Sequence, residues 1–340
     1  MIAALDSGRR AAGLSGGRRW CARIALALGT LAILVWQLGT GPFVDGLRAV
    51  DGAALAAGFA LGFLTTACCA WRWRTVATGL GLELPLGAAL AFYYRSLFLN
   101  LSLPGGVLGD VHRGLSHGRE SRELALSLRA VAWERFAGQA VQAALTVGVL
   151  LLAPSPVRGA MPLIALALFA ALAAAALALR RGFGPARGRW ARWRAVLARD
   201  LRECLLARDV WPSIALASAL VVAGHAATFL VAARATGASA PIGELLPLAL
   251  LVLAVAALPN VGGWGPREGA TAWAFAAAGL GAQAGVATSV AYGVIVLVAA
   301  LPGAAVLAAG WARRTLPERR PGRRALGTAA LAQRQGAPDG

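Results

Sequence analysis

Two short stretches decide the expected fold, LPGGVLGDVHRG at residues 103–114 and LPNVGGWGPREG at residues 258–269. Each begins with Leu-Pro, continues into a Gly-rich turn and then carries an acid and an Arg. Each also ends an apolar run, 86–103 for the first stretch and 242–258 for the second. A membrane-spanning helix needs about 20 mostly apolar residues, so both runs are broken where such a helix should continue. Because Pro and Gly disfavour helix continuation, we expect a helix break at both stretches.

The composition around the two breaks is that of an integral membrane protein. Hydrophobic residues make up 58% of the 340 residues and charged residues 14%, against about 45–50% and about 25% in soluble domains. Six other apolar runs are long enough to cross a bilayer: 24–40, 53–71, 130–153, 161–179, 211–233 and 284–310. The sequence therefore predicts an all-α polytopic membrane protein with six full spans and two broken, re-entrant helical segments.

The distribution of Arg predicts the orientation in the membrane. The chain has 33 basic residues, all of them Arg, against 15 acidic residues, for a net charge of +18. Arg is concentrated before the first run, in the 180–209 loop and after the last run, whereas the connections at 41–52, 154–160 and 234–241 hold one Arg each. The positive-inside rule then places both termini on the cytoplasmic side of a bacterial inner membrane. Since the Arg groups alternate with spans, no nucleic-acid partner is expected.

The two halves of the chain repeat in opposite orientation. The two Leu-Pro pairs lie 155 residues apart, and the first follows a cytoplasmic end whereas the second follows an outside loop. Such paired broken helices favour a transporter with its binding site near the bilayer midplane. The alternative is that 242–258 and 266–282 are two complete short spans. The expected parts are a basic N-terminus (1–23), a first membrane repeat (24–153), a second repeat (154–310) with the basic 180–209 loop, and a disordered basic tail (311–340).

Charged and polar residues at the breaks are the candidate binding groups. Ionisable side chains within a membrane are costly and usually functional. An acid beside an Arg suits a zwitterionic or anionic lipid head group, because Arg and helix N-terminal amides hold a phosphate while the carboxylate meets an amine or a proton. The alternative is that these charges only pair with one another. The candidate binding residues are Arg95, Asn100, Asp110, Arg113, Glu134, Arg135, Arg267 and Glu268, and the turn residues are Pro104, Gly105, Gly106, Gly109, Pro259, Gly262, Gly263 and Gly265.

Other polar residues point to structure rather than chemistry. His225, Gln139 and Gln142 lie on apolar runs and are interpreted as hydrogen-bond partners between helices. The four Cys form no C-x-x-C pair and the three His are scattered, so neither a disulfide framework nor a metal site is expected. No nucleotide-binding loop or nucleophile motif occurs. We therefore expect no cofactor and no enzymatic activity.

The two stretches resemble the signatures of a known family, the membrane domain of lysylphosphatidylglycerol synthases together with stand-alone flippase-like proteins. The first signature, N-x-x-L-P-x-x-x-G-G-D-x-x-R followed by Glu-Arg, is matched except that Leu108 replaces its first Gly. The second, P-x-x-G-G-x-G-x-x-E, is matched throughout. The similarity covers roughly 20–312. The matching residues are Asn100, Leu103, Pro104, Gly109, Asp110, Arg113, Glu134 and Arg135, then Pro259, Gly262, Gly263, Gly265 and Glu268.

The resemblance implies movement of a phospholipid or lipid-linked head group between leaflets, with an anionic phospholipid or aminoacyl-phospholipid as the partner. The soluble domain that transfers the aminoacyl group has no expected counterpart after the last span, so the chain should not make the lipid itself. Two alternatives stay open. One is a secondary transporter of a small soluble anion, and the other is a non-transporting subunit that recruits a soluble lipid-modifying enzyme. A homo-oligomer is possible in each case.

Overall fold

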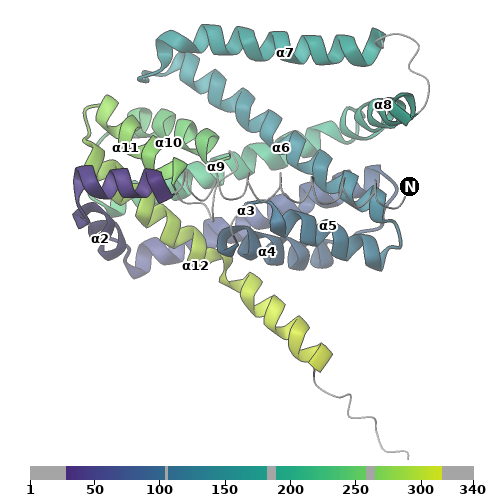
Figure 1. The fold of residues 1–340 in the computed structure, drawn as a ribbon, viewed down its shortest axis with the longest axis horizontal. Helices are drawn as coiled ribbons and strands as arrows, with labels where there is room; N and C mark the ends of the chain where they lie inside the picture. The colour runs from purple at the N-terminus through teal and green to yellow at the C-terminus, as the bar shows by residue number, and fades with distance from the viewer. Residues whose placement is uncertain (1–27, 104–105, 182–188, 258–264, 316–340) are drawn as a thin grey trace, which may run out of the picture.

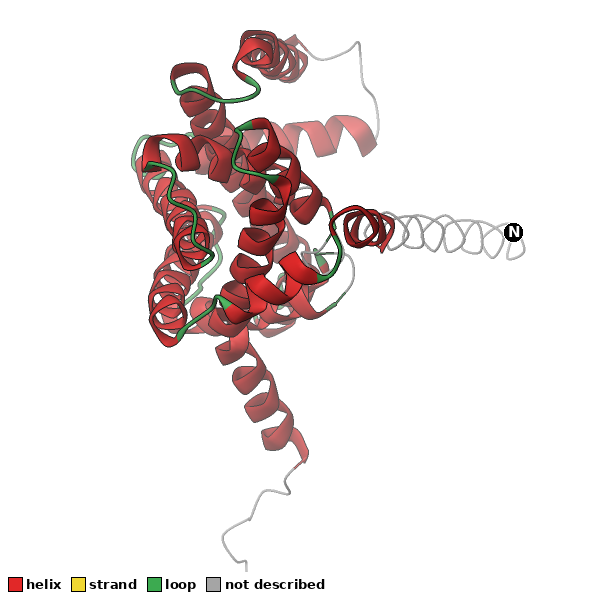
Figure 2. Cartoon of the chain, turned by 90° about the vertical axis from the view of Figure 1, so that its left-hand side faces the viewer, coloured by secondary structure: helices red, strands yellow, loops and turns green. Residues whose placement is uncertain are grey.

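The computed structural model describes residues 28–103, 106–181, 189–257 and 265–315, and these residues form helices joined by loops, with no strand among them (Figures 1 and 2). A helix at Leu28–Leu38 comes first. It is followed by α2 (Gly41–Arg48), α3 (Gly52–Gly79), α4 (Leu86–Ser102), α5 (Leu108–Glu120), α6 (Leu124–Leu152), α7 (Met161–Arg181), α8 (Arg189–Asp200), a π-helical turn (Leu201–Leu205), α9 (Trp211–Ala235), α10 (Ile242–Ala256), α11 (Pro266–Ala277) and α12 (Ala282–Thr315).

Four of the described helices are long and apolar enough to cross a membrane: α3, α6, α9 and the 282–312 part of α12. They correspond to four of the six predicted spans. The predicted span 161–179 is helical as α7, and the predicted span 24–40 is described only from residue 28. The predicted span 53–71 lies within α3, whose helix continues for two more turns to Gly79.

Both predicted helix breaks are present. The first apolar run ends with α4 at Ser102, and α5 begins at Leu108. The second run ends with α10 at Ala256, and α11 begins at Pro266. These four helices have 12 to 17 residues, so each is about 18–25 Å long, shorter than the ~30 Å of a bilayer core. α4 packs on α5 and α10 packs on α11; in Figure 1, α10 and α11 lie at the left and α5 lies to the right.

Local sequence explains where several helices begin. The Asp51 side chain accepts a hydrogen bond from the Ala54 backbone N–H at 2.7 Å and thereby caps α3. Pro85 and Pro241 precede α4 and α10 in extended conformation, and Pro266 occupies the first position of α11. Gly265 adopts a φ of 101° just before α11, a conformation open to glycine.

Close helix contacts depend on small residues. α3 packs along α9, and α12 contacts α2, α3, α4, α9 and α11. A methyl group built on Gly58 would lie 2.0 Å from Ile295, and one on Gly224 would lie 2.3 Å from Thr65. These glycines let the backbones approach, as is usual for helices packed within a membrane. Small residues therefore set the distances between these central helices.

The segment before α9 is anchored to the helix bundle by polar contacts. Asp200 is buried and accepts hydrogen bonds from Arg129 and Trp133 of α6. In the π-helical turn, the Cys204 thiol donates to the Val76 carbonyl at 3.4 Å. Burial, and secondarily the charge of Asp200, raise the pKa of Cys204 to about 11. This thiol therefore stays protonated at neutral pH and serves as a small packing group.

Candidate ligand-binding site

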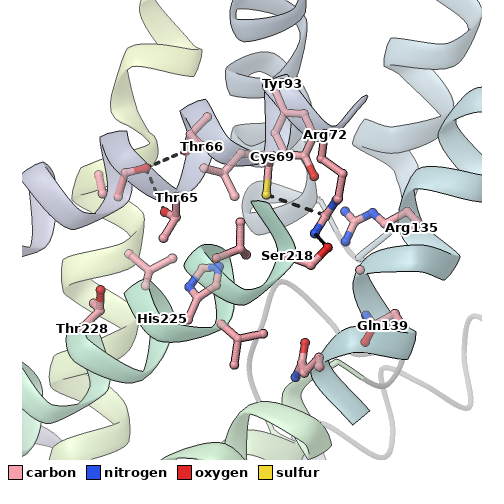
Figure 3. A pocket seen from close by; sticks show the side chains of 18 of the residues that line it. Thr65, Thr66, Cys69, Arg72, Tyr93, Arg135, Gln139, Ser218, His225 and Thr228 are labelled. Carbon is pink, nitrogen blue, oxygen red and sulfur yellow. Dashed lines mark hydrogen bonds between the residues drawn. The ribbon is translucent and has the colours of Figure 1, made fainter. Parts of the chain in front are cut away.

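A cavity of about 170 Å³ lies at the centre of the helix bundle, where α3, α4, α6, α9 and α12 meet (Figure 3). Arg72 and Arg135 lie together on one side of it, and His225 points into it from α9. The cavity is unusually polar for a space between apolar helices. Its polar lining consists of Thr65, Thr66, Cys69, Arg72, Tyr93, Arg135, Gln139, Gln142, Ser218, His225 and Thr228.

Glu134 is the centre of an ionic network beside the cavity. Its side chain is fully buried. Arg72 donates from Nε and Nη2 to Glu134 Oε1 at 3.0 and 2.5 Å, while Arg113 donates from Nη2 to Oε2 at 2.6 Å. The Tyr93 hydroxyl also donates to Oε1, at 3.3 Å. One carboxylate thus joins α3, α4, α5 and α6, since each partner comes from a different helix.

Asp110 forms the second part of this network. It accepts hydrogen bonds from Ser96 and Asn100 of α4, both at 3.1 Å, from Arg113 Nε at 3.1 Å and from Arg135 Nη2. The Asn100 side-chain oxygen accepts in turn from the Gly109 N–H at 2.7 Å. A methyl group on Gly109 would lie 2.0 Å from the Ser96 carbonyl oxygen. Gly109 is therefore required for the close approach of α5 to α4.

The network has one more positive charge than it has negative charges, because Arg72, Arg113 and Arg135 face the two carboxylates. Arg113 is completely buried between aromatic rings, with its guanidinium carbon 4.7 Å from the Trp73 ring centre and 4.3 Å from that of Tyr93. Such cation–π contacts stabilise a desolvated guanidinium. The excess charge is available at Arg135, whose side chain is 42% exposed.

Arg135 and Gln139 line both the cavity and a neighbouring hollow of about 470 Å³. This hollow, here called the lateral groove, is lined by Gly106, Val107, Asp110, Val111, Leu128, Val131, Ala132, Arg135, Gln139, Ala256 and Ala257. Val107 and Val111 are 48% and 46% exposed, so the groove opens to the outside of the bundle. A polar cavity thereby borders a mostly apolar groove at these two residues.

Arg267 and Glu268 form a separate ionic pair at the start of α11. Glu268 is fully buried and accepts from the Gly265 N–H at 2.6 Å and from Arg267 Nη2 at 2.6 Å. Ser289 of α12 hydrogen-bonds to both side chains, at 3.0 and 3.2 Å. Neither charged residue lines the central cavity. Arg267 and Glu268 thus form a cluster apart from the one that holds Asp110 and Arg113, and of the predicted binding residues it is Arg135 that lines the central cavity.

Tyr292 and His225 form a chain of contacts from this second ionic pair to the cavity. The Arg267 guanidinium carbon lies 5.3 Å from the Tyr292 ring centre, and the Tyr292 hydroxyl lies 3.3 Å from His225 Nδ1. The interpretation of His225 as a hydrogen-bond partner between helices agrees with this contact. His225 also lines the cavity, which its isolated position on an apolar run does not indicate.

The other predicted residues fall into three groups. Asn100, Asp110, Arg113, Glu134 and Arg135 are brought together in one network, as described above. Arg95 lies away from the central cavity, in a different hollow. Gln139 and Gln142 line the central cavity, so their side chains face space that a ligand can enter. Of the turn residues, Gly106, Gly109 and Gly265 are described, whereas Pro104, Gly105, Pro259, Gly262 and Gly263 lie outside the described residues.

Arg72 is the principal residue that the sequence analysis missed. It directly follows the predicted span 53–71, at what the sequence predicts to be a cytoplasmic end, yet it is buried and paired with Glu134. The missed signal is its spacing. Gly58, Gly62, Thr65, Cys69 and Arg72 recur every three or four residues and all line the cavity, which marks a small and polar face along α3.

These features define a multi-pass, all-helical membrane protein with a charged cavity between its helices. The chain belongs to the family of the lysylphosphatidylglycerol synthase transmembrane region, whose model matches residues 20–303. This match confirms the resemblance seen in the two signatures. No curated protein matches the chain significantly.

Proposed function

We propose that this protein moves a lipid with an anionic head group across the cytoplasmic membrane. One observation carries the proposal: the polar cavity and the apolar lateral groove share Arg135 and Gln139. A phospholipid needs both environments at once, because its phosphate is charged and its acyl chains are apolar. The membership in a lipid-related family supports the same substrate class.

Arg135 is the proposed phosphate ligand. Its Nη2 donates to Asp110, but its Nε has no hydrogen-bond partner in the described part of the chain. Arg72, in contrast, uses all three guanidinium nitrogens on Glu134, Ser218 and Cys69. The excess positive charge of the network therefore favours a phosphate at Arg135, with the Gln139 amide as a second hydrogen-bonding group.

The two helix pairs are proposed to be re-entrant hairpins in inverted halves of the membrane domain. α4 with α5 would enter from the cytoplasm and α10 with α11 from outside, with both termini in the cytoplasm. The short helices and their mutual packing support this arrangement, because none of the four is as long as the bilayer core is thick. We propose no enzymatic role, and movement of the lipid would be downhill or coupled to an ion gradient.

A secondary transporter of a small soluble anion is the second candidate. The excess positive charge at the cavity would suit such a solute equally well. The lateral groove distinguishes the two functions, because a soluble anion has no acyl chain to place there. A non-transporting subunit that recruits a lipid-modifying enzyme would need neither feature for its activity.

The test measures exchange of fluorescent phosphatidylglycerol between leaflets of liposomes that contain the purified protein. Arg135→Gln should abolish exchange, whereas Arg158→Gln, which removes an exposed Arg, should leave it unchanged. Ala132→Trp places an indole in the groove and should also stop lipid exchange. Ala140→Trp, at an exposed position of α6 outside the groove lining, is its matched control.

The same liposomes distinguish the candidates. Loss of lipid exchange in Ala132→Trp with no flux of inorganic phosphate in any variant supports lipid translocation. Phosphate flux that Ala132→Trp retains and Arg135→Gln loses would favour the soluble-anion transporter. Absence of both fluxes in folded wild-type protein would contradict transport and favour the recruiting subunit.

A further inference from the structure

Another charged hollow, separate from the central cavity and the lateral groove, lies between α4, α5 and α12. It has a volume of about 300 Å³ and shares no lining residue with the central cavity or the lateral groove. Arg95 of α4 and Arg119 of α5 contribute its positive charges, and Glu120 contributes one negative charge. Leu307 and Trp311 of α12 form part of its apolar wall.

Arg95 lacks the partner that the arginines of the central network have. Arg72, Arg113 and Arg135 each pair with a carboxylate, whereas no carboxylate in the described part of the chain forms an ion pair with Arg95. Its Nε is buried and has no hydrogen-bond acceptor there. The only described compensation is its guanidinium carbon at 5.4 Å from the Phe92 ring centre. A buried donor without an acceptor is costly, so an anion in the hollow would complete this site.

The apolar wall indicates which anion fits. Trp311 is 70% exposed, and Trp is typical of the boundary between the acyl chains and the head groups of a membrane. Arg313 and Arg314 follow it in the sequence, which is the composition of a helix end at an anionic lipid surface. A phosphate bound by Arg95 would therefore lie at head-group depth, with α12 beside its acyl chains.

We propose that this hollow binds the phosphate of an anionic phospholipid that stays bound while transport proceeds elsewhere. The lipid would join the α4–α5 pair to the end of α12 by its phosphate on Arg95 and its acyl chains against Leu307 and Trp311. The site is distinct from the transport path, so its occupancy does not depend on whether the protein moves lipid. Arg95, predicted from the sequence as part of the head-group cavity, is thereby assigned to a second site.

The experiment titrates purified full-length protein in detergent with phosphatidylglycerol and measures the rise of its melting temperature. All titrations are made in Arg135→Gln protein, so that the central cavity does not contribute. Adding Arg95→Gln should raise the half-saturating lipid concentration about tenfold, the effect of losing one charge-assisted hydrogen bond of ~1.4 kcal/mol. Adding Arg48→Gln, which removes an exposed Arg of α2, should not change it.

Further titrations distinguish a phospholipid from free inorganic phosphate as the ligand. Trp311→Ala should weaken phosphatidylglycerol binding, and inorganic phosphate alone should not raise the melting temperature at lipid-equivalent concentrations. If inorganic phosphate stabilises the protein as well as the lipid does, and Trp311→Ala has no effect, the lipid assignment is wrong. Equal titration curves for Arg95→Gln and Arg48→Gln would overturn the site. If Arg95→Gln does not fold, Arg95→Lys, which keeps the charge but loses Nε, replaces it and should show a smaller shift in the same direction.

Discussion

At the scale of single residues, the membrane domain depends on how two carboxylates are divided among three arginines. Each oxygen of Glu134 serves a different guanidinium, Arg72 on one side and Arg113 on the other. Taking such groups out of water is expensive, and their mutual attraction offsets that cost only when the geometry is good and further hydrogen bonds are present. The network is therefore sensitive to the loss of any one member.

Glu134→Gln should destabilise the protein strongly. The substitution removes the negative charge while two buried arginines stay in place, a situation that costs about 3–5 kcal/mol. The measurement is the free energy of unfolding of purified protein in mixed micelles. Glu203→Gln breaks an ion pair whose side chains are 75% and 64% exposed and should give no measurable change. Equal stability of the two variants would contradict a structural role for Glu134.

At the scale of elements, the contact between α4 and α5 positions the site. The first turn of α5 lies against the last two turns of α4, where Asp110 and Gly109 meet Ser96 and Asn100. No side chain larger than hydrogen fits at residue 109, because the Ser96 carbonyl occupies the space. The backbone distance between these helices thus sets the position of Asp110, and through Asp110 that of Arg135.

Gly109→Ala should force α5 away from α4. Overpacking of this kind costs about 1–3 kcal/mol, and the displacement would break the hydrogen bonds of Asp110 to α4. We expect a lower melting temperature together with loss of lipid exchange. Gly148→Ala, in α6 with nothing within 4 Å of the added methyl, should be neutral or stabilising by up to about 1 kcal/mol. A Gly109→Ala protein that exchanges lipid at the wild-type rate would exclude this role of the contact.

At the scale of the whole molecule, α10 and α11 lie on the left of Figure 1 and α5 on the right, and α4 lines the central cavity. Each pair has its own apolar core. Phe229, Leu245 and Phe275 belong to the core around α10 and α11, and Trp73 and Phe92 to the core around α4. If the protein transports lipid as proposed, one half would move against the other, as in the alternating access of transporters with repeated halves.

The proposed topology places Arg48 and Arg192 on opposite sides of the membrane. Both side chains are exposed, and they lie before α3 and within α8. In protein whose native cysteines are replaced by Ser, an impermeant maleimide should label Arg48→Cys only from outside and Arg192→Cys only in inverted vesicles. Labelling of both positions from the same side would contradict an odd number of crossings between them.

Much of this protein could be predicted from its sequence alone. The apolar runs, the two breaks and the resemblance to the family follow from local composition and short motifs, since a bilayer demands long apolar helices and Pro-Gly segments interrupt them. Asp110, Arg113, Glu134 and Arg135 could be identified as a group because they lie at or near the first break, where an ionisable residue within a membrane is costly.

Only the tertiary structure decided which of these charges meet. Arg72 joins the site because α3 extends past residue 71 and Gly138 of α6 leaves room for its guanidinium. Arg95 does not belong to the site, because its side chain lines a different hollow. Arg267 and Glu268 form an ion pair with each other at the start of α11. The physical reason is that composition sets the cost of burying a charge, whereas its partner depends on helix rotation and spacing, which arise from packing among distant residues.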